Sequence, residues 1–343
     1  MPPSVPSSRV TIHDVARHAG VSHQTVSRVM NEHPSVAPST RQKVQQAIHT
    51  LHYQPNLAAR TLVTQRTSTL GIVGFGLLYY GPAQMMLNIE QAARNRGYSV
   101  TLASIPELRE AEIERALLDL RRQNVDGIIM ITPLKGVDTD RIRAVCGAIP
   151  FVLVDAPDAG SLSGATIDQK AGGHLAAQHL IALGHERIAL LCGPQRWHDA
   201  RLRLDGWTEA LNEAGLRPVT VLEGDWTAAS GFGLTQELLA ARTSFTGLLV
   251  GNDQMALGAL WALHERGVSV PRDVSIVGFD DIPESRFFHP PLTTVRQDFA
   301  TLGALSLATL LEAIESPDTT PQPHVLKPEI LIRASTTTPT PSP

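Results

Sequence analysis

From residue 69 onward, short apolar runs of strand length alternate with longer amphipathic stretches, and few folds accommodate this alternation. Strands are predicted at residues 70–75, 99–103, 127–131, 151–154, 188–192, 247–250 and 274–279. Helical periodicity occupies residues 83–96, 110–123, 171–183, 203–214 and 254–266. Strands that alternate with helices in this way form parallel sheets covered by helices on both faces. The pattern therefore predicts an α/β body.

This body spans about 275 residues, which is more than one hydrophobic core usually serves. We therefore expect two similar lobes, with the ligand beyond the carboxyl ends of the strands, in the cleft between them. The expected bounds of the body are 68–336, and residues 337–343 are expected to be a disordered, Pro-rich tail. The lobes are expected at roughly 68–167 with 299–326, and 168–298 with 327–336.

Polar side chains follow several of the predicted strands. Asp155, Asn252 and Asp280 come within two residues of a strand end, Arg203 begins a helix, and Trp226 ends a short extended run. Carboxylate, amide and guanidinium groups beside an aromatic ring suit a sugar, because they bond to hydroxyls while the ring covers the apolar C–H face. Alternatively, Asn252 and Asp280 only cap the next helix or turn, and Arg203 pairs with an internal acid.

The first 66 residues differ from the body in charge. They contain seven Lys and Arg but only two Asp and Glu, whereas the rest of the chain contains 22 basic and 31 acidic residues. A small basic part joined to an acidic one indicates that the basic part meets a polyanion. Charge alone does not decide the question, because a small domain can also have a basic surface that binds no polyanion.

Three short helical patterns occupy residues 11–52 of this basic part. Thr11 and Asp14 have the spacing of a capping box, Gly20 provides a sharp turn, Ser22 caps the second helix and Pro38 begins the third. Such an arrangement predicts a helix-turn-helix, whose second helix lies in the major groove of DNA. The alternative is a generic three-helix unit with solvated polar residues.

The second helical pattern begins with His23, Gln24 and Thr25, and Arg28 follows one turn later. Gln can form paired hydrogen bonds with adenine, and Arg can bridge both acceptors of guanine, each worth about 1–3 kcal/mol of discrimination. The start of this helix is therefore predicted to read bases.

Longer segments carry a family resemblance. Val10–Asn31 (VTIHDVARHAGVSHQTVSRVMN) closely resembles the DNA-binding signature of the lactose/galactose repressor (LacI/GalR) family, and Tyr53–Leu62 resembles its hinge. Segments similar to lactose-responsive members recur in order at residues 200–207, 223–226, 251–258, 277–281 and 290–299. The resemblance implies a disordered N-terminus at residues 1–9 and an all-α helix-turn-helix head at residues 10–55. It also implies a hinge at residues 56–67, followed by a two-lobed α/β periplasmic-binding-protein-like body.

For the head, the resemblance implies that His23, Gln24 and Arg28 read bases. Lactose-responsive members can have an aromatic hydroxyl in place of His23, so the operator sequence stays open. The residues implied to anchor phosphates are Thr11, Ser22, Thr25, Asn31 and Tyr53.

For the hinge, Asn56 can cap a helix that is too short to be stable alone. In the family this helix orders when two copies meet on DNA. The resemblance places Ala59 beside the groove floor and Leu62 as an apolar wedge, which kinks the duplex. The alternative is a plain linker.

For the body, the resemblance implies that Asp155, Arg203, Asn252 and Asp280 hydrogen-bond a small-molecule effector, with Trp226 and Gln297 lining the pocket. The first-lobe wall around Phe75, Tyr79, Tyr80 and Glu107 departs from the lactose-responsive pattern, so the identity of the sugar stays open.

Two-part operators require a twofold dimer. The resemblance places Leu257 and Phe287-Phe288 at the dimer contact. The heptad tail that makes some members tetramers is missing, so we expect a homodimer.

The function expected from these features is a repressor that releases operator DNA when a sugar binds. The alternatives are a corepressor-activated regulator, a sugar-binding transport protein and, more distantly, a sugar-converting enzyme. No catalytic residue, metal site or cofactor is predicted: Gly74-Phe75-Gly76 lacks the third glycine of a dinucleotide loop, and Cys146 and Cys192 lack metal-ligand spacing. Without an apolar signal or membrane-length segment, we expect a cytoplasmic protein that contacts no membrane.

Overall fold

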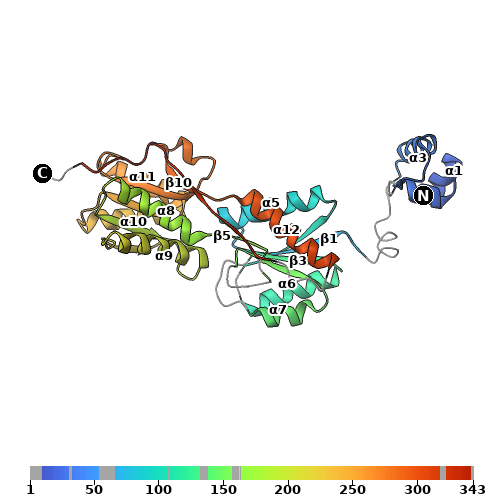
Figure 1. The fold of residues 1–343 in the computed structure, drawn as a ribbon, viewed down its shortest axis with the longest axis horizontal. Helices are drawn as coiled ribbons and strands as arrows, with labels where there is room; N and C mark the ends of the chain where they lie inside the picture. Colours follow the sequence, from blue (N-terminus) through green and yellow to red (C-terminus); the bar gives the residue numbers. More distant parts are fainter. Residues whose placement is uncertain are drawn as a thin grey trace, which may run out of the picture. The chain divides into compact units, whose positions relative to one another are not determined.

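A computed structural model describes residues 10–30, 33–53, 66–106, 109–131, 138–156, 162, 164–316 and 322–340. The chain divides into two units, a head up to Thr67 and a body from Ser68, drawn as separate ribbons in Figure 1. None of the helices in these ranges combines the length and apolar character that crossing a bilayer needs.

The head contains three short helices: α1 (Ile12–Ala19), α2 (His23–Met30) and α3 (Pro38–Thr50). The predicted capping box is confirmed, since Thr11 accepts from the Asp14 backbone and Asp14 accepts from the Thr11 backbone. Gly20 ends α1 at a φ of 66°, in the left-handed region that favours glycine. Ser22 Oγ accepts from the Thr25 N–H at 3.1 Å and so caps α2.

One small core holds the head together. Its buried members are Val15, Ala16, Val26, Val29, Val44, Ala47 and Tyr53. The apolar side of α2 faces this core, so the polar residues at its start face outward.

The first lobe of the body is a parallel sheet in the order β2-β1-β3-β4. Alternate side chains of β3 point to opposite faces: Ile129 packs with helices α5 and α12, and Ile128 and Met130 pack with α6 and α7. The bounds are β1 Thr69–Phe75, β2 Ser99–Ile105, β3 Gly127–Ile131, β4 Phe151–Val154, α5 Tyr80–Asn95, α6 Glu110–Arg122, α7 Thr139–Cys146 and α12 Phe299–Glu315.

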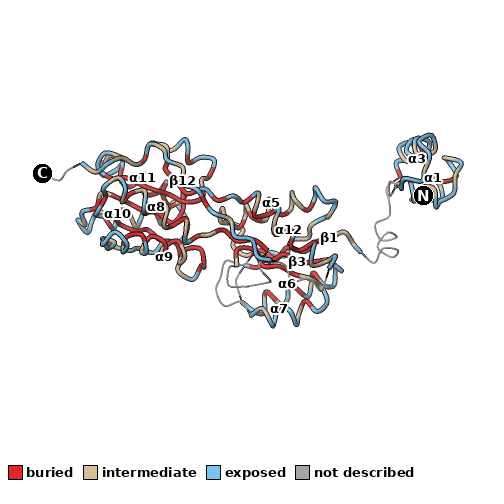
Figure 2. The backbone as a smooth tube through the Cα atoms, viewed as in Figure 1, coloured by how far each residue is buried: buried red, intermediate tan, exposed pale blue. Residues whose placement is uncertain are grey.

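The second lobe is a six-stranded sheet in the order β12-β10-β9-β8-β6-β7, parallel except for the pairing of β10 with β12. Helices α8 and α9 pack on one face, and α10 and α11 pack on the other. The inner strands of both sheets are buried between the helices, as Figure 2 shows in red. The bounds are β6 Ile188–Cys192, β7 Val221–Glu223, β8 Gly247–Val250, β9 Ser275–Asp280, β10 Thr293–Arg296, β12 Glu329–Leu331, α8 Gln169–Ala182, α9 His198–Glu213, α10 Ala228–Ala240 and α11 Asp253–Glu265.

The chain passes between the lobes after β5 (Ala165–Ile167), after β10 and after β11 (His324–Leu326). β5 and β11 pair in parallel, and the Asp168 N–H donates to the Leu326 carbonyl at 2.8 Å where both leave the first lobe. After β10, helix α12 returns to the first lobe and packs on α5.

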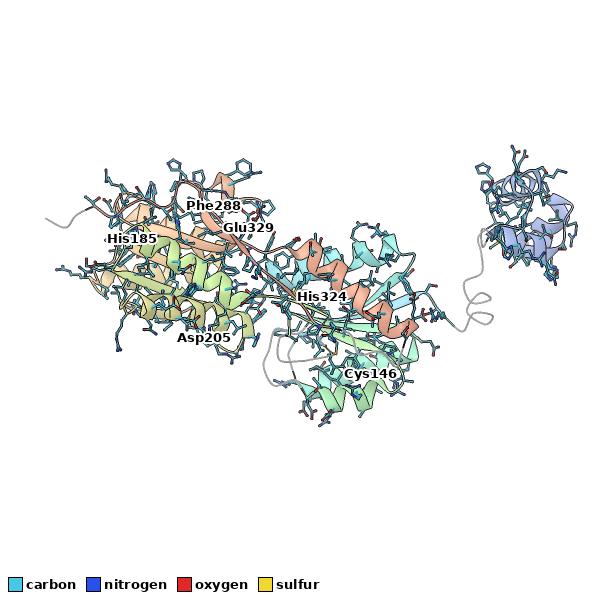
Figure 3. All side chains as sticks on the ribbon, viewed as in Figure 1. Cys146, His185, Asp205, Phe288, His324 and Glu329 are labelled. Carbon is cyan, nitrogen blue, oxygen red and sulfur yellow. The ribbon has the colours of Figure 1, made fainter. Side chains whose placement is uncertain are left out.

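The predicted fold class is confirmed, and each strand and helix predicted for the body has a counterpart, as do the three helices of the head. The predicted hinge helix lies outside the described residues. The tail is corrected in part. Residues 337–340, expected to be disordered, are hydrogen-bonded to the second lobe: Thr337 N–H donates to Ser275 Oγ at 3.0 Å, and its carbonyl accepts from His185 at 2.9 Å. His185 is labelled in Figure 3.

Candidate functional site

The start of α2 forms an exposed polar surface on the head. His23, Gln24 and Arg28 are all exposed there, as base reading requires, and Thr25 is half-buried. Thr11 and Ser22 are exposed at the starts of α1 and α2. The structure therefore brings six predicted DNA-binding residues to the ends and outer side of two short helices.

Tyr53 is placed differently from the other predicted phosphate contacts. Its ring belongs to the head core and is only 9% exposed, and burial raises the pKa of its hydroxyl. The remaining predicted DNA contacts, Asn31, Asn56, Ala59 and Leu62, lie outside the described residues, as does Glu107 in the body.

A cleft between the two lobes gathers most of the predicted effector residues. Arg203, Trp226, Asn252 and Asp280 line it. It encloses about 300 Å³ including its open mouth. The other lining residues are Tyr79, Tyr80, Gly81, Pro82, Trp197 and Asp199.

Arg203 is held in the cleft by a ring of hydrogen bonds. Its Nε donates to Gln169 at 2.9 Å and its Nη1 donates to the Gly251 carbonyl at 2.6 Å. Gln169 donates to Gln297 at 2.8 Å, Gln297 donates to Asp280 at 2.6 Å, and Asp280 lies 3.4 Å from Arg203 Nη1. Because each group orients the next, the guanidinium is held in place before any ligand arrives. Gln297 thus lies behind the cleft and supports it.

Two of the predicted residues also perform the structural roles that the sequence left open. Asn252 caps α11, accepting from the Met255 N–H at 2.9 Å, and donates to the Trp226 carbonyl at 3.1 Å. Asp280 does pair with Arg203, and burial raises the pKa of Asp280 to about 6 although that pairing opposes the rise. These structural roles hold the side chains at the cleft wall, where they are available to a ligand.

Asp155 and Asp199 form a hydrogen-bonded pair of carboxyl groups across the lobes. Asp155 follows β4 in the first lobe and accepts from the Ile167 N–H at 3.1 Å, whereas Asp199 is in the first turn of α9 in the second lobe. Burial raises the pKa of both, and the nearby Asp155 carboxyl raises that of Asp199 further. Two buried carboxyl groups in contact share one proton between them.

Aromatic rings from both lobes pack together at the cleft. Trp197, immediately before α9, contacts Phe75 (centroids 5.7 Å apart) and Tyr79 (5.2 Å) of the first lobe. It also meets Trp226 at 5.9 Å with a 77° angle between the rings. Phe75 therefore contacts a residue that lines the cleft, Trp197, and is not itself among the lining residues. A Cβ at Gly193 would lie 2.2 Å from the Trp226 ring, so that ring needs a glycine beneath it.

Three residues of this site have positive φ angles: Asp155 at 54°, Trp226 at 75° and Asp280 at 111°. L-residues rarely adopt this region, and each instance costs about 1–3 kcal/mol. Such strain is concentrated at ligand sites, where the surrounding contacts maintain it. All three residues were predicted from the sequence to belong to the site, and all three are also backbone outliers.

Sequence reasoning missed Trp197, Asp199 and Gln169. Trp197 lies just before α9 and Asp199 in its first turn, where the sequence shows no apolar periodicity, and Gln169 looks like an ordinary first-turn helix residue. In the described ranges, no three His, Cys, Asp or Glu side chains are grouped as metal ligands.

Comparisons with known proteins agree with this architecture. Residues 11–56 match the family described as bacterial regulatory proteins, lacI family, and residues 177–336 match the periplasmic binding protein-like domain. The chain is 39% identical over 303 residues to the lactose operon repressor of Escherichia coli (strain K12), covering 88% of this chain and 84% of that protein. It is 36% identical over 333 residues to the HTH-type transcriptional repressor PurR of Haemophilus influenzae (strain PittEE), covering 95% and 98%.

Solved structures show the same similarity. The Lac repressor dimer bound to operator and the anti-inducer ONPF matches with a TM-score of 0.87 and 37% identity, over 96% of this chain and all of that one. The transcriptional regulator CelR in complex with cellobiose matches with a TM-score of 0.71 and 33% identity, over 95% of this chain and all of that one.

Proposed function

Because the chain belongs to the lacI family of bacterial regulatory proteins, we propose that it is a transcriptional repressor that releases operator DNA when a sugar binds the cleft. The observation that supports the effector most directly is the preorganised Arg203–Asp280 pair, buried at the cleft wall and held by Gln169 and Gln297. Guanidinium and carboxylate side by side can donate to one sugar hydroxyl and accept from the next.

The head is proposed to read the operator through His23, Gln24 and Arg28, with Thr11, Ser22 and Thr25 on phosphates. The boundaries 10–55 for the head, 56–67 for the hinge and 68–336 for the body remain part of this proposal. As a regulator of chromosomal DNA, the protein would act in the cytoplasm.

The coupling is proposed to run through the lobe crossings. Gln169 begins the helix after β5, and Gln297 follows β10, so two members of the Arg203 ring lie where the chain changes lobe. A ligand that moves these side chains favours a different arrangement of the lobes, and the hinges that precede the first lobes respond. The expected coupling is about 1–3 kcal/mol.

The protein is also proposed to be a homodimer. On α11, Leu257 is 44% exposed and Trp261 is 56% exposed, four residues apart and so on one face of the helix. Phe287 is 81% exposed, whereas Phe288 packs partly into the second-lobe core. Large apolar side chains gathered on a surface indicate a protein contact.

The test is a mobility shift on the DNA upstream of the chain's own gene, with sugars added. We expect a specific shift that at least one sugar reverses in the wild type, while Arg203→Lys binds DNA normally but no longer responds. Lysine keeps the positive charge but lacks the planar guanidinium, whose Nε and Nη1 donate separately to Gln169 and Gly251. A shift that a small molecule strengthens would instead identify a corepressor, and no specific shift would favour a transport protein.

A further inference from the structure

Two histidine rings from different helices meet on the surface of the head. His13 is the second residue of α1, and His23 is the first residue of α2. Their ring centroids lie 5.0 Å apart, and the ring planes are tilted by 46°. Both side chains are exposed. The rings therefore form an exposed contact at the start of the helix that is proposed to read bases.

The contact between the rings is what restricts the His23 side chain. In the described part of the chain, neither His13 nor His23 takes part in a hydrogen bond, whereas the His33 ring accepts from the Ser35 N–H at 3.3 Å. An exposed side chain without such bonds samples several rotamers, and a neighbouring ring reduces that freedom. The ring nitrogens of His13 and His23 stay available to a duplex.

The charges around the two rings favour an anion. The other charged or titratable side chains of α1, α2 and α3 are Asp14, Arg17, His18, Arg28, Arg41, Lys43 and His49. Hydrogen bonds from Thr11 hold the pKa of Asp14 below 3.8, and Asp14 also pairs with Arg17 at 3.4 Å. Arg41 donates to the His33 carbonyl at 2.9 Å, beyond the opposite end of α2. The one carboxylate of these helices is thus already engaged, and DNA supplies the anion that the rings lack.

Histidine changes its charge close to neutral pH, since its ordinary pKa is about 6.5. A protonated ring donates at both nitrogens, whereas a neutral ring donates at one. Phosphate oxygens and the major-groove edge of guanine are acceptors, so a duplex favours the protonated ring. Two protonated rings in contact repel each other. We therefore expect the pair to take up one proton, not two, when DNA binds.

The head contains a second histidine pair that serves as a matched control. The rings of His49 and His52 have centroids 6.3 Å apart, and both side chains are exposed. His49 lies in the last turn of α3, a helix that carries none of the predicted base-reading residues. This second pair separates an effect of titration at the reading helix from an effect of histidines in general.

We propose that His13 is a positioning residue of the operator-reading surface: it restricts the His23 ring, and the pair takes up a proton when operator DNA binds, so that operator affinity rises as the pH falls from about 8 to about 6. The inference rests on the proposed function, because it concerns how the head binds its operator. One proton changes the affinity by at most about tenfold per pH unit. The bound state holds the proton, so the gain in affinity is present at low pH and is lost as the pH rises.

The pH dependence is tested by fluorescence anisotropy with the full-length protein and a labelled duplex from upstream of its own gene. The ionic strength is constant, because salt alone changes DNA affinity, and a chelator removes metal ions. Wild type should bind about tenfold more tightly at about pH 6 than at about pH 8. His13→Gln and His23→Gln should each change by less than about twofold over this range, whereas His49→Gln should keep the wild-type dependence.

His13→Tyr separates positioning from protonation. Tyrosine keeps a ring against His23 but titrates only near pH 10. At about pH 8 His13→Tyr should bind operator within about twofold of wild type, while His13→Gln loses about three- to fivefold because the ring contact is gone. His13→Tyr should nevertheless show no rise in affinity at low pH. Circular dichroism at each pH checks that every variant is folded.

Calorimetry with the same duplex counts the protons directly, when it is repeated in two buffers that differ in ionisation enthalpy. Wild type should take up about half a proton per head at about pH 7, and His13→Gln close to none. An operator affinity independent of pH, a dependence that survives in His13→Gln, or a His13→Tyr as weak as His13→Gln at about pH 8 would overturn the inference and leave the repressor function intact. No specific binding at any pH would overturn both.

Discussion

Replacing Asp280 with Asn is expected to stabilise the body while abolishing its response to effector. Burial raises the pKa of Asp280 from 3.8 to about 6, so the folded protein holds this proton more tightly than the unfolded chain does. The stability that the protonated group contributes is fully present below pH 3.8 and is lost as the pH rises through 6. About two pKa units, at 1.36 kcal/mol each, amount to about 3 kcal/mol at neutral pH.

Asn keeps the shape of the side chain without its charge, and its oxygen still accepts from Gln297. It also tolerates the φ of 111° at this position better than most residues do. Arg203 loses its charged partner, but the raised pKa already includes that attraction and remains high. The folded state therefore accommodates the neutral Asn better than the ionised Asp280, although Asn no longer presents a carboxylate to a sugar.

The assay is urea unfolding of the full-length chain at several pH values, with the transition of the body followed by tryptophan fluorescence. The difference in unfolding free energy between Asp280→Asn and wild type should grow from near zero at about pH 4 to about 3 kcal/mol above about pH 6.5. Asp205→Asn, an exposed change on α9 labelled in Figure 3, should stay within about 0.5 kcal/mol of wild type. An Asp280→Asn protein that is less stable at pH 7, or a difference independent of pH, would refute the reasoning.

Three further predictions concern the head, the dimer and acid stability. Arg28→Ala should weaken operator binding about 10- to 100-fold and reduce the sequence preference at one base pair of the operator. Mobility shifts with competitor DNA measure this effect, and an equal loss of affinity for random DNA would contradict it. Trp261→Asp should convert dimer to monomer in sedimentation experiments, because it places a charge on the exposed apolar face of α11; an unchanged mass would point to another interface. Burial lowers the pKa of His185 below 6.5, so the unfolded chain takes up the proton first and stability falls as the pH drops below 6.5. His185→Gln should reduce that fall in pH-dependent unfolding, and an unchanged pH profile would exclude His185 as its source.

The strands and the site residues that follow them could be predicted because both depend on local sequence. A strand covered on both faces is apolar at every position, as Ile188–Cys192 shows. In open α/β sheets the ligand binds beyond the carboxyl ends of such strands, so polar residues just after them are candidate site residues. Asp155, Asn252 and Asp280 were found from that rule alone.

Trp197 and Asp199 could not be predicted because their positions depend on tertiary contacts. The first turn of α9 is polar yet buried, since it faces the cleft, so periodicity placed the start of the helix at Arg203, five residues after the observed His198. β5 and β11 are three residues long and are stable only as partners in the lobe crossing. A pattern confined to one segment cannot indicate which distant segment it will meet.

The claim that most needs testing is that the cleft and the operator site are energetically linked. Because linkage is reciprocal, the sugar that binds should bind about tenfold or more weakly to the operator-bound protein than to the free protein, by calorimetry in matched buffer. Equal sugar affinity with and without operator DNA would contradict the account.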